Sequence, residues 1–244
     1  MTVVDVTHRP GQLRATLTGP VLGEDTVTAL IAALERAERT PRVRAFVIAS
    51  AGPAFCTGMP LAGDRATSDV LGGLALAHQL LTGLARSPLA TVALVDGQVT
   101  GGGVALAAAC DQVVAGPQAT FRITELLVGL LPAVLLPVVA RRTGLHRVFA
   151  LALTAQPLDA AAAVGTGLAD RAAPDPEAEL VRIMRELGRA TPEAVAALKR
   201  YRDTLQPESG GLELRQALDA MRERLDDPAG RARRSLLAGQ GLLP

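Results

Sequence analysis

Two short glycine-containing loops could hold a developing negative charge. Residues 55–59 (Phe-Cys-Thr-Gly-Met) follow an apolar run at 43–49, and residues 100–103 (Thr-Gly-Gly-Gly) follow a second apolar run at 91–95. Glycine lets the backbone come close to a ligand because it has no Cβ. The second loop is expected to open a helix, whose free N–H groups lie at the positive end of the helix dipole. Two such N–H groups converging on one point would form an oxyanion hole.

One carboxylate lies in an apolar segment. Glu125 is the only acidic residue between Asp111 and Asp159, and leucine and valine residues follow it. Burial among apolar side chains raises the pKa of a carboxyl group, which suits proton transfer near neutral pH. The alternative interpretation is a charge or capping partner at the start of a helix.

Other chemistries are excluded by what the sequence lacks. The three histidines and two cysteines have no metal-ligand spacing: His8, His78, His146, Cys56 and Cys110. No Gly-x-Ser-x-Gly segment exists, which excludes the usual serine hydrolase. The glycines at 96–103 match neither the dinucleotide fingerprint nor a phosphate loop, and a tight turn with close backbone packing is their simplest alternative role. We therefore predict no metal and no bound cofactor, and the cysteines are predicted to fill small spaces in the core.

Alternating strand and helix patterns must position these residues. Strands are predicted at 12–18, 43–49, 91–95 and 112–115, and helices at 24–39, 70–86 and 104–110. From Pro192 onward the pattern is helical only, at 192–205, 212–226 and 228–238. The alternation predicts an α/β fold. We expect a core over residues 1–190 and a helical C-terminal region over 191–244.

Composition narrows the functional class. The chain has 244 residues, of which 49% are hydrophobic and 20% charged, as in a globular protein with a sizeable core. A net charge of +1 and only 2% aromatic residues argue against nucleic-acid binding. The longest apolar run, 126–140, contains two prolines and is too short to span a bilayer. With no secretion signal and no disulfide framework visible, we expect a cytoplasmic protein.

Together the segments resemble the crotonase, or enoyl-CoA hydratase/isomerase, superfamily. The matching motifs lie at 55–59, 100–111 and 121–129, in the family's order and spacing, and the resemblance extends from about residue 12 to the C-terminal helices. It implies a spiral of ββα units assembled as a homotrimer or hexamer. In that family the C-terminal helices cover the active site of a neighbouring subunit.

The resemblance also implies roles for individual residues. The backbone N–H groups of Met59 and Gly102 would hold a thioester oxygen as it becomes an enolate, and Glu125 would transfer the proton. Other residues of these motifs are expected to contact the substrate: Thr57, Gly58, Gly101, Ala105 and Thr124. The substrate would be carried as a phosphopantetheine or coenzyme A thioester.

Ala105 marks a departure from the two-glutamate hydratases, because it occupies the position of their first glutamate. A single carboxylate at Glu125 can still remove an α-proton. It can return that proton to a leaving hydroxyl group on the same face, or to the γ-carbon.

Finer matches are similar to the dehydratases of polyketide β-branching cassettes. They comprise the loop at 55–59, the run at 119–137, and the segments at 141–144 and 199–201. This implies loss of water from a 3-hydroxy-3-methylglutaryl group on an acyl carrier protein, giving a 3-methylglutaconyl thioester. Residues 18–23 lack the basic residue and the asparagine that help the family hold the coenzyme A nucleotide, and a carrier-bound substrate does not need them.

A glutaryl substrate has a free carboxylate that requires a cation. Arg65 and Arg122 are the candidates, and a solvated surface arginine is the alternative role for each. Lys199 and Tyr201 lie on a late helix that can reach the substrate entrance in this family, although solvated or core-facing roles are favoured. His78 is expected to be structural.

Other functions remain as alternatives to the dehydratase. A Δ3-Δ2 enoyl-CoA isomerase also needs only one glutamate, and a general enoyl-CoA hydratase is the broader alternative. Turnover of a 3-hydroxy rather than a 3-enoyl thioester separates the dehydratase from the isomerase. A scaffold that docks on a carrier protein without catalysis is the non-enzymatic alternative, and the paired loops with Glu125 argue against it.

Overall fold

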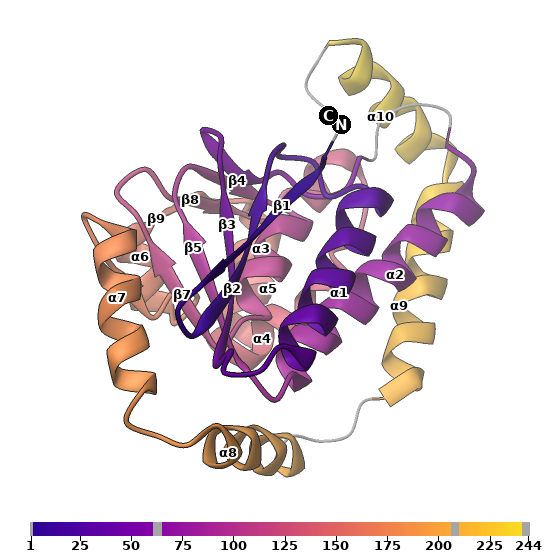
Figure 1. Cartoon of the computed structure of the whole chain (residues 1–244). Coiled ribbons are helices and arrows are strands. Elements are labelled where there is room, and N and C mark those ends of the chain that lie inside the picture. Colours follow the sequence, from indigo (N-terminus) through magenta and orange to yellow (C-terminus); the bar gives the residue numbers. More distant parts are fainter. Residues whose placement is uncertain (1, 61–64, 206–209, 241–244) are drawn as a thin grey trace.

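A six-stranded sheet forms the centre of the computed structural model, which describes residues 2–60, 65–205 and 210–240 (Figure 1). The strands follow the order β1-β2-β3-β5-β7-β10. β1 pairs antiparallel with β2, and every later pair in this sheet is parallel. The bounds are Val4–Arg9, Gln12–Leu17, Ala45–Ser50, Ala90–Val95, Gln112–Ala115 and Arg171–Ala172. β5 is buried throughout, as expected for a parallel strand covered on both faces.

A second sheet of four short strands has the order β4-β6-β8-β9. Its first three strands are parallel, and β9 is antiparallel to β8. The bounds are Ala54–Cys56, Gln98–Thr100, Thr120–Arg122 and Leu158–Asp159. β4, β6 and β8 each directly follow a long strand of the first sheet, so the chain passes repeatedly from one sheet to the other. The predicted α/β fold is confirmed.

The helices surround the sheets (Figure 1). Their bounds are α1 Glu24–Arg39, α2 Thr67–Arg86, α3 Gly102–Ala108, the 3₁₀ helix η1 Glu125–Val128, α4 Leu135–Thr143, α5 Leu145–Thr154, α6 Ala160–Thr166, α7 Pro176–Leu187, α8 Pro192–Thr204, α9 Gly210–Asp226 and α10 Pro228–Gly239. α7, α8 and α10 each begin with proline after a side chain that caps the helix: Asp175, Thr191 and Asp227. None of the helices in these described ranges is long and apolar enough to cross a membrane.

The C-terminal helices return to the body of their own chain. α9 packs against α2, and α10 packs against α9 and η1 (Figure 1). α8 is joined to the loop between α2 and β5 by a buried charge cluster. Helices α8 and α9 therefore both pack against α2.

The centre of that cluster is Lys199, the only lysine of the chain. Its side chain is buried, and its Nζ donates hydrogen bonds to the Leu89 carbonyl oxygen at 2.8 Å and to Asp111 Oδ2 at 2.5 Å. Asp111 Oδ1 accepts a second hydrogen bond from Arg202 of α8 at 2.9 Å. Asp111 Oδ2 also accepts the backbone N–H of Thr91. One carboxylate thus ties α8 to the central sheet.

Replacing Lys199 by Met is expected to destabilise the protein by about 3 kcal/mol, because removing one partner of a buried ion pair leaves the other charge without full compensation. Urea unfolding measures the change in the free energy of unfolding. Arg200→Met is the matched control, since Arg200 is the exposed neighbour on the same helix and such a surface change costs within about 0.5 kcal/mol. Equal losses in the two variants would contradict a role for the cluster.

Candidate active site

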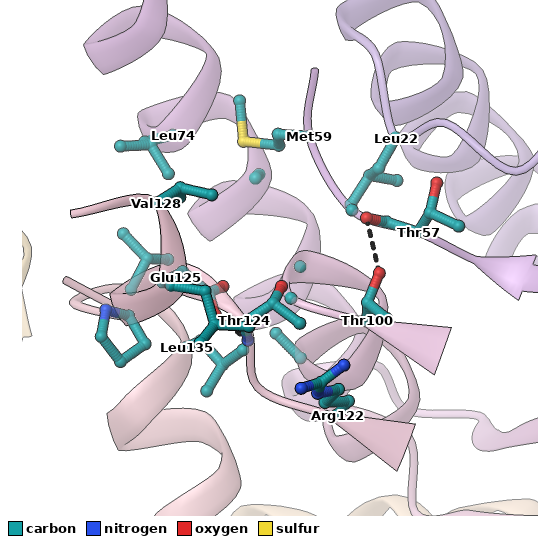
Figure 2. Close-up of a pocket in the computed structure, with 18 of the residues that line it drawn as sticks. Leu22, Thr57, Met59, Leu74, Thr100, Arg122, Thr124, Glu125, Val128 and Leu135 are labelled. Carbon is teal, nitrogen blue, oxygen red and sulfur yellow. Dashed lines mark hydrogen bonds between the residues drawn. The ribbon is translucent and has the colours of Figure 1, made fainter. Parts of the chain in front are cut away.

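The main cavity has a volume of about 730 Å³ and opens among the small sheet, α2, α3 and η1 (Figure 2). This size falls within the usual range for small-molecule sites, about 300–1,000 Å³. Its walls are largely apolar, with side chains from α2 (Leu74), η1 (Val128) and α4 (Leu135). Met221 of α9 and Leu237 of α10 complete the lining from the C-terminal helices of the same chain.

Two backbone amides meet at this cavity where β4 and β6 end. A methyl group added at Gly102 would lie 3.5 Å from the Gly58 Cα and 3.7 Å from the Met59 amide nitrogen. Among the described residues, neither the Met59 nor the Gly102 amide donates a hydrogen bond to a backbone carbonyl. Both N–H groups therefore lack a carbonyl acceptor within the described chain and can bind an acceptor in the cavity. This is the arrangement an oxyanion hole requires.

Hydrogen bonds hold the two loops in this position. The Thr100 hydroxyl group donates to the Thr57 carbonyl oxygen at 2.9 Å, which joins the end of β6 to the end of β4 (Figure 2). The Thr57 amide donates to the Pro20 carbonyl oxygen at 2.7 Å. The Leu22 amide donates to the Gly58 carbonyl oxygen at 2.9 Å. The loop at 57–59 is thus anchored on both sides.

Glu125 is the first residue of η1 and is buried, with 8% of its surface exposed. Its Oε2 accepts the Thr124 backbone N–H at 3.0 Å. A methyl group at Gly101 would lie 3.1 Å from Oε1, so the carboxylate lies beside the residue that precedes Gly102. Burial raises the pKa of Glu125, and hydrogen bonds from backbone amides oppose part of that rise. The geometry places a proton acceptor beside the glycine loop that carries the Gly102 amide.

Other residues of the three motifs lie in the same place. Ala105, one turn along α3 from Gly102, is buried and contributes only a methyl group to the cavity lining. The cavity lining includes every motif residue expected at the site: Thr57, Gly58, Met59, Gly101, Gly102, Ala105, Thr124 and Glu125. Among the lining residues that the structure describes, Glu125 is the one acid.

The two candidate arginines lie in different places. Arg122 lines the main cavity, whereas Arg65 does not. The Arg65 guanidinium instead pairs with Glu24 at 3.3 Å. Lys199 and Tyr201 are also outside the lining, the first in its buried cluster and the second 62% exposed. The sequence patterns of α9 and α10 did not predict that three of their residues would line the cavity: Met221, Arg233 and Leu237.

The cysteines lie in the core. Burial raises the pKa of the Cys56 thiol to about 11 and that of Cys110 to about 12, so both stay protonated at neutral pH. In the part of the chain that the structure describes, no group of three or more His, Cys, Asp or Glu side chains could hold a metal ion.

The buried Glu125 carboxylate should make stability depend on pH. Its raised pKa means that the folded state favours the protonated form, so ionisation destabilises the fold. The Glu125→Gln variant is expected to be more stable than wild type above the raised pKa. This advantage should shrink as the pH falls toward the ordinary glutamate pKa. Urea unfolding of both proteins across this pH range measures the difference.

Glu179→Gln is a comparison variant with the opposite expected effect on stability. Glu179 is equally buried but pairs with Arg171 at 2.6 Å, so its loss should lower the stability at neutral pH. A stability difference between Glu125→Gln and wild type that stays constant with pH would contradict the assigned environment of Glu125.

Comparisons with known proteins agree with this fold. The family described as enoyl-CoA hydratase/isomerase matches residues 16–227. A putative enoyl-CoA hydratase of Thermus thermophilus is 30% identical over 189 residues, which cover 73% of each chain. The bacillaene synthase dehydratase PksH of Bacillus subtilis is 28% identical over 151 residues, 62% of this chain and 58% of that protein. The similarity to a polyketide-pathway dehydratase is thereby confirmed.

Solved structures share the fold. An enoyl-CoA hydratase from Mycobacterium avium has a TM-score of 0.90 and 26% identity, covering 100% of this chain and 98% of that one. A putative polyketide biosynthesis enoyl-CoA hydratase, pksH, from Bacillus subtilis has a TM-score of 0.87 at 21% identity, with 100% and 99% covered, and supports the fold alone. The crotonase-type fold is confirmed. The chain belongs to the enoyl-CoA hydratase/isomerase family and is an enzyme of the hydro-lyase kind.

Proposed function

We propose that the enzyme removes water from a 3-hydroxy-3-methylglutaryl-type thioester on an acyl carrier protein and forms a 3-methylglutaconyl thioester. The observation that carries this proposal is one carboxylate, beside Gly101, in a cavity whose described lining also includes Met59 and Gly102. Ala105 leaves Glu125 as the only acid among the described residues of the lining. One group must therefore serve both as base and as acid.

The reaction follows from this arrangement. The Met59 and Gly102 amides hold the thioester oxygen, and the Glu125 carboxylate takes a proton from the α-carbon. The electrons of that C–H bond form the enolate, whose charge the two amides stabilise. The C–O bond at the β-carbon then breaks, and Glu125 returns its proton to the departing hydroxyl group, which leaves as water. A raised pKa suits both transfers.

The surroundings support this chemistry. Apolar walls exclude water and strengthen the interaction between the amides and the developing charge. Pro20, Val21 and Leu22 line the cavity in the stretch where other family members help hold the coenzyme A nucleotide, and none of the three is basic. A phosphopantetheine arm without adenine fits such a lining. The similarity to a bacillaene synthase dehydratase supports the dehydration.

The proposal includes a homotrimer or hexamer. α5 carries three large apolar side chains one turn apart that are more than half exposed: Leu145 at 70%, Phe149 at 55% and Leu153 at 62%. Covering this stripe would remove apolar area from water, which favours association.

Intact-protein mass spectrometry tests the reaction directly. A carrier protein loaded with 3-hydroxy-3-methylglutaryl-phosphopantetheine is incubated with the enzyme, and loss of one water is the expected result. Parallel reactions with the coenzyme A thioester separate the two carriers. Absence of water loss, together with turnover of a 3-enoyl-CoA, would replace the proposal with the Δ3-Δ2 isomerase that the same single carboxylate could serve.

A further inference from the structure

A second cavity adjoins the main one and has a different character. It measures about 540 Å³, and its lining is rich in polar side chains such as Asp96, Gln118 and Thr120. Gln98, Thr100 and Arg122 line both cavities. We call this second space the polar cavity. The shared residues make it a continuation of the site that holds Glu125.

The strand register explains why these side chains share one surface. β6 and β8 pair so that Gln98 lies opposite Thr120 and Thr100 lies opposite Arg122. Alternate side chains of a strand point to opposite faces of the sheet. The residues between these positions are fully buried, so the four polar side chains form the other face. Arg122 thus lies on a polar surface that runs from the main cavity into the polar cavity.

The Arg122 guanidinium group is anchored through one of its three nitrogens. Its Nε donates to the Ala155 carbonyl oxygen at 2.6 Å. Its two terminal nitrogens have no hydrogen-bond acceptor among residues 2–60, 65–205 and 210–240. A guanidinium group anchored in this way presents a planar pair of donors, the geometry that matches a carboxylate.

The backbone of Arg122 lies beside the loop that carries Gly102. Its carbonyl oxygen accepts the Gly101 amide at 3.0 Å, so its strand lies beside the residue that precedes Gly102. Neighbouring strands are about 4.8 Å apart. Figure 2 shows Arg122 on the segment that continues to Thr124 and Glu125, close to Thr100. The backbone of Arg122 therefore lies one strand spacing from Gly101, and Arg122 lines the same cavity as Gly102.

A second arginine of the main cavity has a different position. Arg233 reaches the cavity from α10, and its Nε donates to the Leu127 carbonyl oxygen at 2.6 Å. It does not line the polar cavity. These are the two cations in the described lining of the main cavity, and only Arg122 also belongs to the sheet beneath the reacting groups. Arg233 is therefore a matched control for charge.

Building on the proposed function, we propose that Arg122 binds the terminal carboxylate of the acyl chain and that the polar cavity receives this end of the substrate. Arg122 then selects dicarboxylic over monocarboxylic acyl thioesters. A carboxylate that binds Arg122 loses part of its hydration, and paired charge-assisted hydrogen bonds from the guanidinium group replace it.

Comparing two substrates tests the selection. The 3-hydroxy-3-methylglutaryl and 3-hydroxy-3-methylbutyryl carrier thioesters differ in one terminal carboxylate. Arg122→Gln is expected to lower kcat/KM for the first by about 10- to 100-fold, the range that hydrogen bonds to a charged group contribute. Turnover of the second should change little, which also shows that the variant folds. Arg122→Lys should recover part of the preference, and Arg233→Gln should leave the ratio between the substrates unchanged.

Binding without turnover separates this inference from the proposed reaction. Glutaryl- and butyryl-pantetheine cannot lose water, so their affinities report on the carboxylate alone. Wild type is expected to bind the glutaryl compound more tightly, and Arg122→Gln to bind both equally. Equal affinities in wild type would overturn the inference, even if dehydration occurs. An equal loss for both compounds in Arg122→Gln would also overturn it, assigning Arg122 a structural role through Ala155.

Discussion

Replacing Glu125 by Gln is expected to lower the dehydration rate by about 10²–10⁴-fold, the usual contribution of a general acid–base group. Glutamine keeps the volume of the side chain but cannot accept the α-proton or return it to the hydroxyl group. The loss should be large because Ala105 offers no second carboxylate, so no other described residue of the lining can take over. Single-turnover mass spectrometry of the loaded carrier protein measures the rate.

The control for this change is Glu179→Gln, which removes another carboxylate that is 8% exposed and lies outside the main cavity. It should keep the wild-type dehydration rate while losing stability. Retained water loss in Glu125→Gln would refute Glu125 as the base. Urea unfolding of the same variant, which is expected to be more stable at higher pH, shows whether a lower rate arises from unfolding.

The long elements of the fold were predictable because their patterns repeat over many residues. The predicted bounds at 24–39 are those of α1, and the shorter strand β7 was also predicted with its observed bounds, 112–115. Strands β4, β6 and β8 have three residues each, too few for an alternating pattern to show. These short strands bring the two glycine loops together. Helix α4 was missed within an apolar run because Pro137 stands in it, yet proline is tolerated in the first turn.

The candidate site, like the fold, could be predicted only in part from the sequence. The types of Met59, Gly102 and Glu125 and their places after strands could be recognised in the sequence, but the convergence of the two amides depends on hydrogen bonds between distant loops. Arg65 and Arg122 could not be distinguished by their distance along the chain. Arg65 pairs with Glu24, a contact across 41 positions that no local pattern records. The sequence pattern did not indicate that α9 and α10 line the cavity of their own chain.

Replacing Gly58 by Ala is expected to lower the dehydration rate by about 10²–10³-fold, the cost of losing one donor of an oxyanion hole. Gly58 has a φ of +86°, a conformation that residues with a Cβ rarely adopt. An added Cβ would lie 2.9 Å from the Gly102 amide nitrogen and 3.1 Å from the Thr100 carbonyl oxygen. Both neighbours are backbone atoms, so relief requires one loop to move and separates the two amides.

A matched glycine change distinguishes this effect from general damage. Gly72 lies on α2, and an added Cβ there meets no atom within 4 Å. Gly72→Ala should therefore retain the wild-type rate and gain helix propensity, up to about 1 kcal/mol. In Gly58→Ala, kcat should fall more than the affinity for a substrate analogue, because the amides act mainly on the charge of the enolate. A loss confined to affinity would mean that the loop at 57–59 only binds the acyl carrier arm, and that the negative charge develops elsewhere.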